Sequence, residues 1–168
     1  MHALHRILVY LPDLVTGEEK TAKDVRDFAV DQTNSYGDKA FDWRETESAG
    51  RWSSVYPDNV IFGRDSGLKI IKELVDTREG VDKDIQRYIK YLYEETSTYN
   101  IADMISSNMS PMGRYYLRML GLLNYGEYVF NSMFYNTRDY DSLITDKLID
   151  EVKEHPEDWA VVLFDCHY

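Results

Sequence analysis

Residues 159–164 have the sequence Trp-Ala-Val-Val-Leu-Phe, a continuous apolar run that stops at Asp165. A second apolar-rich run, Leu4–Leu11, stops at Pro12. Short runs rich in β-branched and aromatic residues predict β-strands. Strands that lack an alternation of apolar and polar residues are usually covered on both faces. These two runs therefore predict a sheet with protein packed on each side.

The other elements follow from the spacing of apolar residues and from turn residues along the chain. Two further strands are expected, at Lys39–Arg44 and at Val60–Phe62. Helices are expected at about Gly17–Gln32 behind a Thr16-x-x-Glu19 capping box, around Leu68–Val75 and Ile85–Tyr93 with a break at Gly80, from Ser110 to about Tyr135, and at Asp141–Glu154.

Without the central helices, the order of elements is strand, helix, strand, strand, helix, strand. This order is typical of the ferredoxin-like βαββαβ sandwich, so the predicted class is α+β with a large helical insertion after the third strand. We expect one domain over residues 1–168, with a core at about 1–64 and 136–168 and the insertion at about 65–135. A ferredoxin-like sheet has one open face, which we expect the inserted helices or a second subunit to cover.

The chain is acidic, with 30 Asp and Glu against 19 Lys and Arg and a formal net charge of −11. Binding to nucleic-acid phosphates needs a basic face, so this balance argues against direct nucleic-acid binding. The most acidic stretch lies within residues 139–158 and is explained either by a solvated helix face or by a surface for a basic protein partner. The candidate partner-binding residues are Asp146, Asp150, Glu151 and Glu154.

The sequence has no features typical of a secreted, membrane or metal-binding protein, and none of the common catalytic motifs. Cys166 is the single cysteine, so a reducing compartment is expected. No signal peptide is apparent, and the apolar region Tyr115–Phe134 is interrupted by polar and charged residues, so we expect a cytoplasmic protein that does not bind a membrane. The four His residues are scattered, so no metal and no cofactor is expected. The usual phosphate-loop and hydrolase motifs do not occur.

Trp, Arg, Asp and His are concentrated in three short segments. An Arg side chain matches phosphate or carboxylate, an indole stacks on a ring, and a His can bind phosphate or act as a general base. These segments therefore predict a ligand site made by Asp42, Trp43, Arg44, Arg51, Trp52, Asp165 and His167. The structural alternative is that Arg51 pairs with Asp42 or Asp165, the two Trp residues cap the core, and His167 fixes the chain end.

The Asp42-Trp43 pair, the Gly50-Arg51-Trp52 triplet and the tail with Asp165 and His167 resemble a group of uncharacterised small proteins from bacteriophages and their hosts. Proteins of this group carry an Asp-Trp, a gap, a Gly-Arg-Trp and an apolar strand that ends in an Asp-x-His tail. This chain has Ala49 where many of them have a second Gly. The resemblance implies a phage-linked origin and a host cytoplasm as the location, and it implies no activity.

Three functions remain open. The first is a non-catalytic acidic protein that binds and inhibits a host defence protein, as an anti-CRISPR inhibitor does, through its acidic and Tyr-rich surface. The second is a protein that sequesters a nucleotide-like small molecule with Trp43, Arg44, Arg51 and His167. The third is an enzyme that acts on such a ligand with Asp42, Asp165 and His167. We favour the first, assign no catalytic residue, and note that a homodimer is compatible with the sequence. The 14 Tyr residues fit either an interface or the edges of a core.

Overall fold

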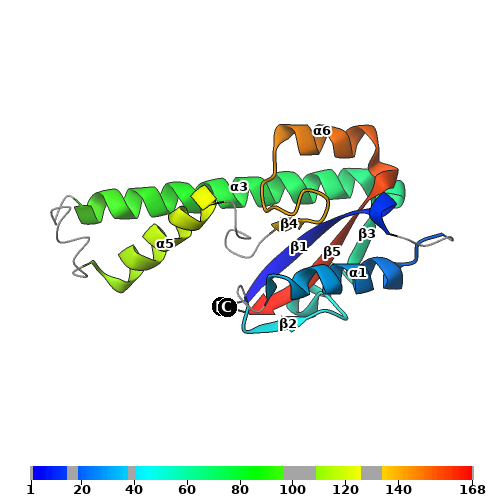
Figure 1. Ribbon diagram of the computed structural model, residues 1–168, viewed down its shortest axis with the longest axis horizontal. Coiled ribbons are helices and arrows are strands. Elements are labelled where there is room, and N and C mark those ends of the chain that lie inside the picture. Colours follow the sequence, from blue (N-terminus) through cyan, green and yellow to red (C-terminus); the bar gives the residue numbers. More distant parts are fainter. Residues whose placement is uncertain (1, 15–18, 38–40, 97–108, 126–133, 168) are drawn as a thin grey trace.

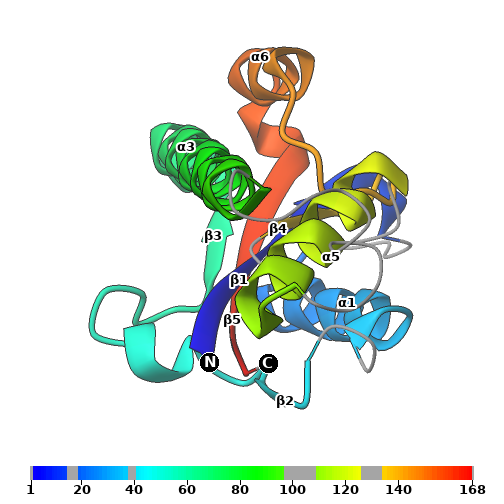
Figure 2. The same ribbon diagram turned by 90° about the vertical axis from the view of Figure 1, so that its left-hand side faces the viewer.

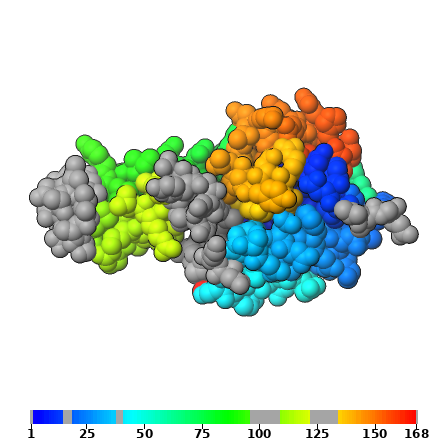
Figure 3. All heavy atoms as spheres, viewed as in Figure 1, coloured from blue at the N-terminus to red at the C-terminus, as the bar shows by residue number. Residues whose placement is uncertain are grey.

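The computed structural model describes residues 2–14, 19–37, 41–96, 109–125 and 134–167. It has two parts, a body built around a twisted sheet and an arm of two helices that extends from it (Figure 1). In the space-filling view the arm forms a lobe that projects from the body (Figure 3). In the described part of the chain, no helix has the length and apolar character needed to cross a bilayer.

Two long strands form the centre of the sheet. β1 (His2–Tyr10) and β5 (Trp159–His167) pair antiparallel over nine residues, from His2 opposite His167 to Tyr10 opposite Trp159. On the far edge of β5 lie β2 (Trp43–Glu45) and β3 (Val60–Phe62), and on the far edge of β1 lies β4 (Phe134–Asn136). The two apolar runs of the sequence thus become the two innermost strands, as their composition predicts.

The α+β class and the pairing of the first and last strands agree with the sequence prediction, but the ferredoxin-like order is not confirmed. In a ferredoxin-like sheet the second and third strands would form a hairpin, but β2 and β3 pair with different halves of β5. The intervening residues 46–59 fold over the sheet edge through a 3₁₀ turn at Gly50–Trp52, rather than through a tight hairpin turn. β4 lies parallel to β1 and adds a strand that the prediction did not contain.

Helices cover both faces of the sheet, as the apolar strands predict (Figure 2). α1 (Ala22–Asn34) packs on one face, and α3 (Gly63–Thr96) and α6 (Asp146–Glu154) pack on the other. Successive side chains of a strand point to opposite faces, so each face receives alternate residues of β5. The α1-side core includes Ala160, Val162, Phe164 and Cys166, and the α3-side core includes Val161 and Leu163. Because α3 and α6 cover the second face, the expectation that protein packs on both sides of the sheet is confirmed.

Several predicted helix boundaries are wrong. α3 continues through Gly80, because a single Gly in a helix costs only about 1 kcal/mol relative to Ala. α1 begins at Ala22 behind a capping box of Thr21 and Asp24. The box predicted at Thr16 lies outside the described residues, as do parts of the predicted strand at Lys39–Arg44.

The two later helices, α5 and α6, also differ in their bounds from the prediction. α5 spans Pro111–Tyr125 in the described residues, and Tyr135, where the prediction ended this helix, belongs instead to β4. α6 begins at Asp146 rather than Asp141, because the Thr145 hydroxyl accepts a hydrogen bond from the backbone N–H of Leu148 and caps the helix there. The predicted segments 97–108 and 126–133 lie outside the described residues.

The second half of α3 runs past the edge of the sheet and packs antiparallel against α5 (Figure 1). We call this pair of helices, residues 81–96 and 109–125, the arm. Its buried centre is made by Tyr88, Leu92, Met109 and Tyr116. The rings of Tyr88 and Tyr116 stack with their centroids 4.3 Å apart. The predicted helical insertion therefore both covers the sheet and builds a separate projection.

Candidate functional site

The start of β1, the end of β5 and the start of β2 meet at one corner of the sheet (Figures 1 and 2). The strand register places His2 on one side of His167 and Trp43 on the other. Residues opposite one another on neighbouring strands share a face, so the three rings lie side by side. The ring centroids of His2 and His167 are 4.9 Å apart, and those of His2 and Trp43 are 5.9 Å apart. We call this group, with Asp42 and Asp165, the corner.

Each His of the corner contacts a carboxylate. In the inner pair, His2 Nδ1 lies 2.8 Å from Asp165 Oδ1, and Asp165 is only 2% exposed. The other carboxylate oxygen, Oδ2, accepts a hydrogen bond of 3.1 Å from the backbone N–H of Arg51. A buried carboxylate is tolerated when both oxygens have polar partners, so the inner pair is a satisfied structural contact.

The outer pair lies at the surface. His167 Nδ1 is 2.6 Å from Asp42 Oδ1, and both side chains are exposed. The backbone N–H of Asp42 also donates to the carbonyl of His167, which fixes the two residues relative to each other. Trp43 is 48% exposed beside them. A core role would bury the indole, so the structural alternative does not explain Trp43.

A shallow hollow opens along the outer edge of β2. It has a volume of about 310 Å³ and is lined by Val30, Phe41, Asp42, Trp43, Arg44 and Thr46. Arg44 faces the α1 side of the strand, where one guanidinium nitrogen donates to the carbonyl oxygen of Thr33 at 3.0 Å. The structure therefore brings Asp42, Trp43 and Arg44 together around one hollow, with His167 next to Asp42.

Two of the predicted site residues have other positions. Trp52 is half-buried and packs against the α3-side core, so the structural explanation holds for this residue. Arg51 is exposed and contacts Asp165 through its backbone N–H rather than through its side chain. The predicted ion pair between the Arg51 guanidinium and Asp165 is thus replaced by a backbone hydrogen bond.

His2 also belongs to the corner, although it is not among the predicted site residues. Its only distinguishing signal is that it begins an apolar strand, and its position next to His167 depends on the register of β1 against β5. Cys166 is excluded from the corner, as its place next to His167 on a strand predicts. It is buried in the α1-side core, and burial raises the pKa of its thiol to about 12, so it is not a poised nucleophile.

The corner can bind an anion or move a proton. A carboxylate on Nδ1 orients an imidazole, a side chain that can bind an anion or transfer a proton. Across the described residues, no group of three or more His, Cys, Asp and Glu side chains has the arrangement of a metal site. The chemistry of the corner is therefore that of two oriented imidazoles beside an exposed indole.

The four acidic residues proposed for partner binding lie on α6, and three of them already contact cations of the same chain. Asp146 contacts Arg78, Asp150 contacts Lys153, and Glu151 contacts Arg138 and Lys147, whereas Glu154 is exposed. These internal contacts reduce the negative charge that the face offers to a partner.

Comparisons of the chain with protein-family models, with curated proteins and with solved structures give no match.

Proposed function

We propose that the corner and the adjacent hollow bind a small anion that carries a flat ring, the chemical class to which nucleotides belong. The observation that carries the proposal is the half-exposed Trp43 indole, which lies beside the imidazoles of His2 and His167, while Trp43 and Arg44 both line the adjacent hollow. Stacking of a base on an aromatic side chain contributes about 1–3 kcal/mol to binding.

Two Arg residues near the corner supply positive charge that an anion needs, although the net charge is −11 and the corner also holds two carboxylates. Arg44 lines the hollow, and the exposed Arg51 follows the Gly50 backbone that covers Asp165. The negative charge of the rest of the molecule lowers the expected affinity and makes cationic ligands the main competitors.

The test is isothermal titration calorimetry of the full chain with a panel of nucleoside mono-, di- and triphosphates. Inorganic phosphate serves as the ligand without a ring, and adenosine as the ligand without a charge. We expect binding only when both parts are present. A panel in which no ring-bearing phosphate binds would overturn the proposal.

Trp43→Ala should weaken binding by roughly 10- to 100-fold, as expected for the loss of one stacking contact. Tyr93→Ala is the matched control, because it removes an exposed aromatic ring that lies on the arm, away from the corner. Each titrated mixture is also analysed for chemical change of the ligand. Turnover that disappears in His167→Ala would make the corner a catalytic site, whereas an intact ligand supports sequestration.

A second candidate function, favoured by the charge distribution, is binding to a basic protein such as a host defence protein. Residues 81–125 contain five acidic and five basic residues, so the whole net charge of −11 belongs to the body. Such a field steers a basic partner toward the body and makes association sensitive to salt.

Reversal of the exposed Glu154 to Lys tests this second candidate with little risk to the fold. Reversal of Asp146 or Glu151 is less informative, because it also breaks contacts with Arg78 or Arg138. Binding to a purified basic candidate protein should weaken with added salt and with Glu154→Lys. Binding that is unchanged by both would remove the acidic surface from consideration.

A further inference from the structure

The arm differs from the body in charge and in composition. The span 81–125 has no net charge, and it contains seven of the 14 Tyr and four of the six Met residues of the chain. Aromatic residues and Met are enriched where proteins associate, and acidic residues are depleted there. The arm is therefore the part of this acidic molecule that can approach another surface without a charge penalty.

The arm has a small core of its own. Three of the four buried residues of its centre come from two helices and the fourth, Met109, lies just before α5; the other apolar residues packed around them are only partly covered. Helices that are apolar over most of their circumference are normally buried or at an interface, and stable helical bundles usually contain four helices. Two helices thus supply half of such a bundle.

One flank of the arm carries exposed aliphatic residues from both helices. Ile89 follows Tyr88, which faces α5, and Leu117 follows Tyr116, which faces α3. One residue corresponds to about 100° of helical rotation, and because the helices are antiparallel both rotations lead to the same side of the arm. Ile89 is 54% exposed and Leu117 is 50% exposed.

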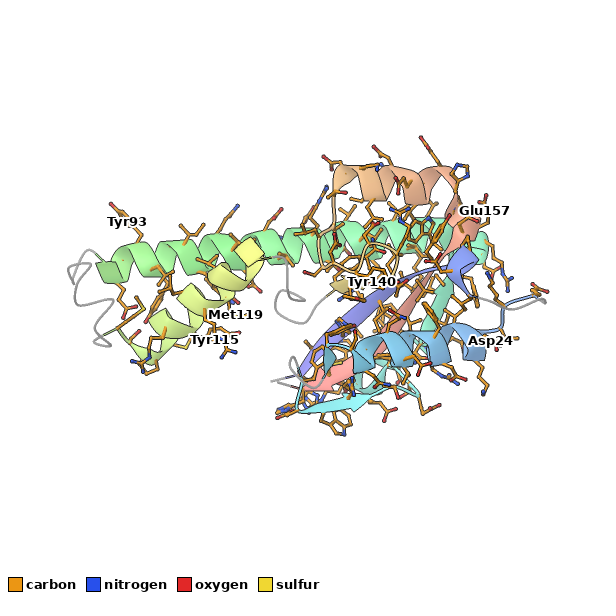
Figure 4. The ribbon with its side chains drawn as sticks, in the orientation of Figure 1. Asp24, Tyr93, Tyr115, Met119, Tyr140 and Glu157 are labelled. Carbon is orange, nitrogen blue, oxygen red and sulfur yellow. The ribbon has the colours of Figure 1, made fainter. Side chains whose placement is uncertain are left out.

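Tyr93 extends this flank toward the end of the arm. It lies one turn beyond Ile89 and points away from α5 (Figure 4). Tyr115 and Met119 come from the other side of α5 and are partly covered. The flank with Ile89 and Leu117 is therefore the less covered of the two.

We propose that the arm is a self-association surface, and that its occupant is the arm of a second copy of this chain. The two flanks that carry Ile89, Tyr93 and Leu117 face each other across a two-fold axis and complete a four-helix bundle. A two-fold contact of this kind is self-complementary. The inference does not depend on the ligand proposed for the corner.

The charge distribution selects a second copy as the occupant. The arm, with four acidic and five basic residues in 81–96 and 109–125, offers little attraction to a strongly charged partner, whereas a second arm carries as little net charge and matches it. Two bodies that each carry the net negative charge repel each other, and an antiparallel pairing of arms places them at opposite ends of the bundle. The second half of α3 is about 25 Å long at 1.5 Å per residue, enough to hold the bodies apart.

The test is analytical ultracentrifugation of the full chain over a range of concentrations and salt. We expect the wild type to sediment with twice the chain mass of 19.7 kDa, and the double variant I89E/L117E to sediment with the mass of one chain. Leu68→Glu is the matched control, because Leu68 is 85% exposed on the same helix but outside the arm. This control should sediment as the wild type does.

The salt series separates apolar pairing of arms from charge-driven contacts between bodies. Added salt screens the repulsion of the bodies, so it should strengthen the association. Circular dichroism establishes that I89E/L117E keeps its helices. A wild type that is still monomeric at about 100 μM, on the order of 100-fold above a Kd of about 1 μM, overturns the proposal. A double variant that still forms the dimer overturns it as well.

Discussion

Substitution of Gly50 by Ala tests whether the turn over the corner is built as closely as its geometry indicates. Gly50 has a φ of +50°, a backbone conformation that residues with a Cβ rarely adopt. A Cβ placed on Gly50 would lie 2.4 Å from Oδ2 and 2.5 Å from Cβ of Asp165. Because Asp165 is buried and bonded to His2 and to the backbone of Arg51, it has little freedom to move away.

The expected cost has two parts. The left-handed conformation costs a residue with a Cβ about 1–2 kcal/mol. Forcing an additional carbon into a closely packed region typically costs about 1–3 kcal/mol. Together they predict a decrease of about 2–5 kcal/mol in the free energy of unfolding. For a chain of this size, that decrease lowers the Tm by roughly 5–15 °C.

Urea denaturation followed by circular dichroism measures this difference. Gly80→Ala is the matched control, because Gly80 lies inside α3 and a Cβ there would meet nothing within 4 Å. This control should stabilise the protein by about 0.5–1 kcal/mol through the helix propensity of Ala. A Gly50→Ala variant that is as stable as the wild type would refute the close contact between the Gly50 backbone and Asp165. So would a result in which both substitutions shift the free energy of unfolding in the same direction.

Three further predictions concern buried groups. Burial raises the pKa of the Cys166 thiol to about 12, so a thiol-reactive dye at pH 8 should label native protein far more slowly than unfolded protein; equal rates would contradict the burial. The Glu73 carboxylate lies 2.8 Å from Arg6 Nε and accepts a hydrogen bond of 2.6 Å from the Tyr56 hydroxyl. Glu73→Ala should therefore lower the free energy of unfolding, measured by urea denaturation, by about 3–5 kcal/mol. The control Asp76→Asn, at the surface of the same helix, should lower it by less than about 1 kcal/mol. Burial and the contact with Glu73 raise the pKa of Tyr56 from 10.0 to about 12. The stability that this shift contributes is therefore complete below pH 10 and is lost as the pH rises through about 12. Tyr56→Phe should reduce this loss of stability at high pH, and a variant with the same dependence of stability on pH as the wild type would refute the role of Tyr56.

The central strand pair and the covering of both faces could be predicted because they depend on composition alone. The strand order could not. β2 and β3 have three residues each, too few for a pattern that indicates a partner, and both pair with β5. β4 follows an apolar region whose periodicity is also that of a buried helix, and periodicity alone does not separate these two cases for a short run.

The members of the corner could be predicted only in part. Trp43, Asp42 and His167 stood out because Trp, Asp and His are concentrated in short segments, and the structure brings them together. His2 could not be found, because its contact with Asp165 spans 163 positions of the sequence and depends on strand register. Trp52 is predicted as a site residue because Trp and Arg are concentrated around it, but the 3₁₀ turn directs it to the core.

The inner and outer pairs of the corner have different environments, and this difference decides which variants report on function. Asp165 is buried and holds the backbone of Arg51, so its removal disturbs the fold as well as any site. Asp42, Trp43 and His167 lie at the surface, where substitutions usually change stability by less than about 0.5 kcal/mol. Ligand binding that is lost in a variant of the outer pair, at unchanged stability, therefore comes from the site itself. The same loss in an Asp165 variant combines a disturbed fold with a disturbed site. Variants of Asp42, His167 and Trp43 therefore test function, whereas Asp165 and His2 hold these residues in position.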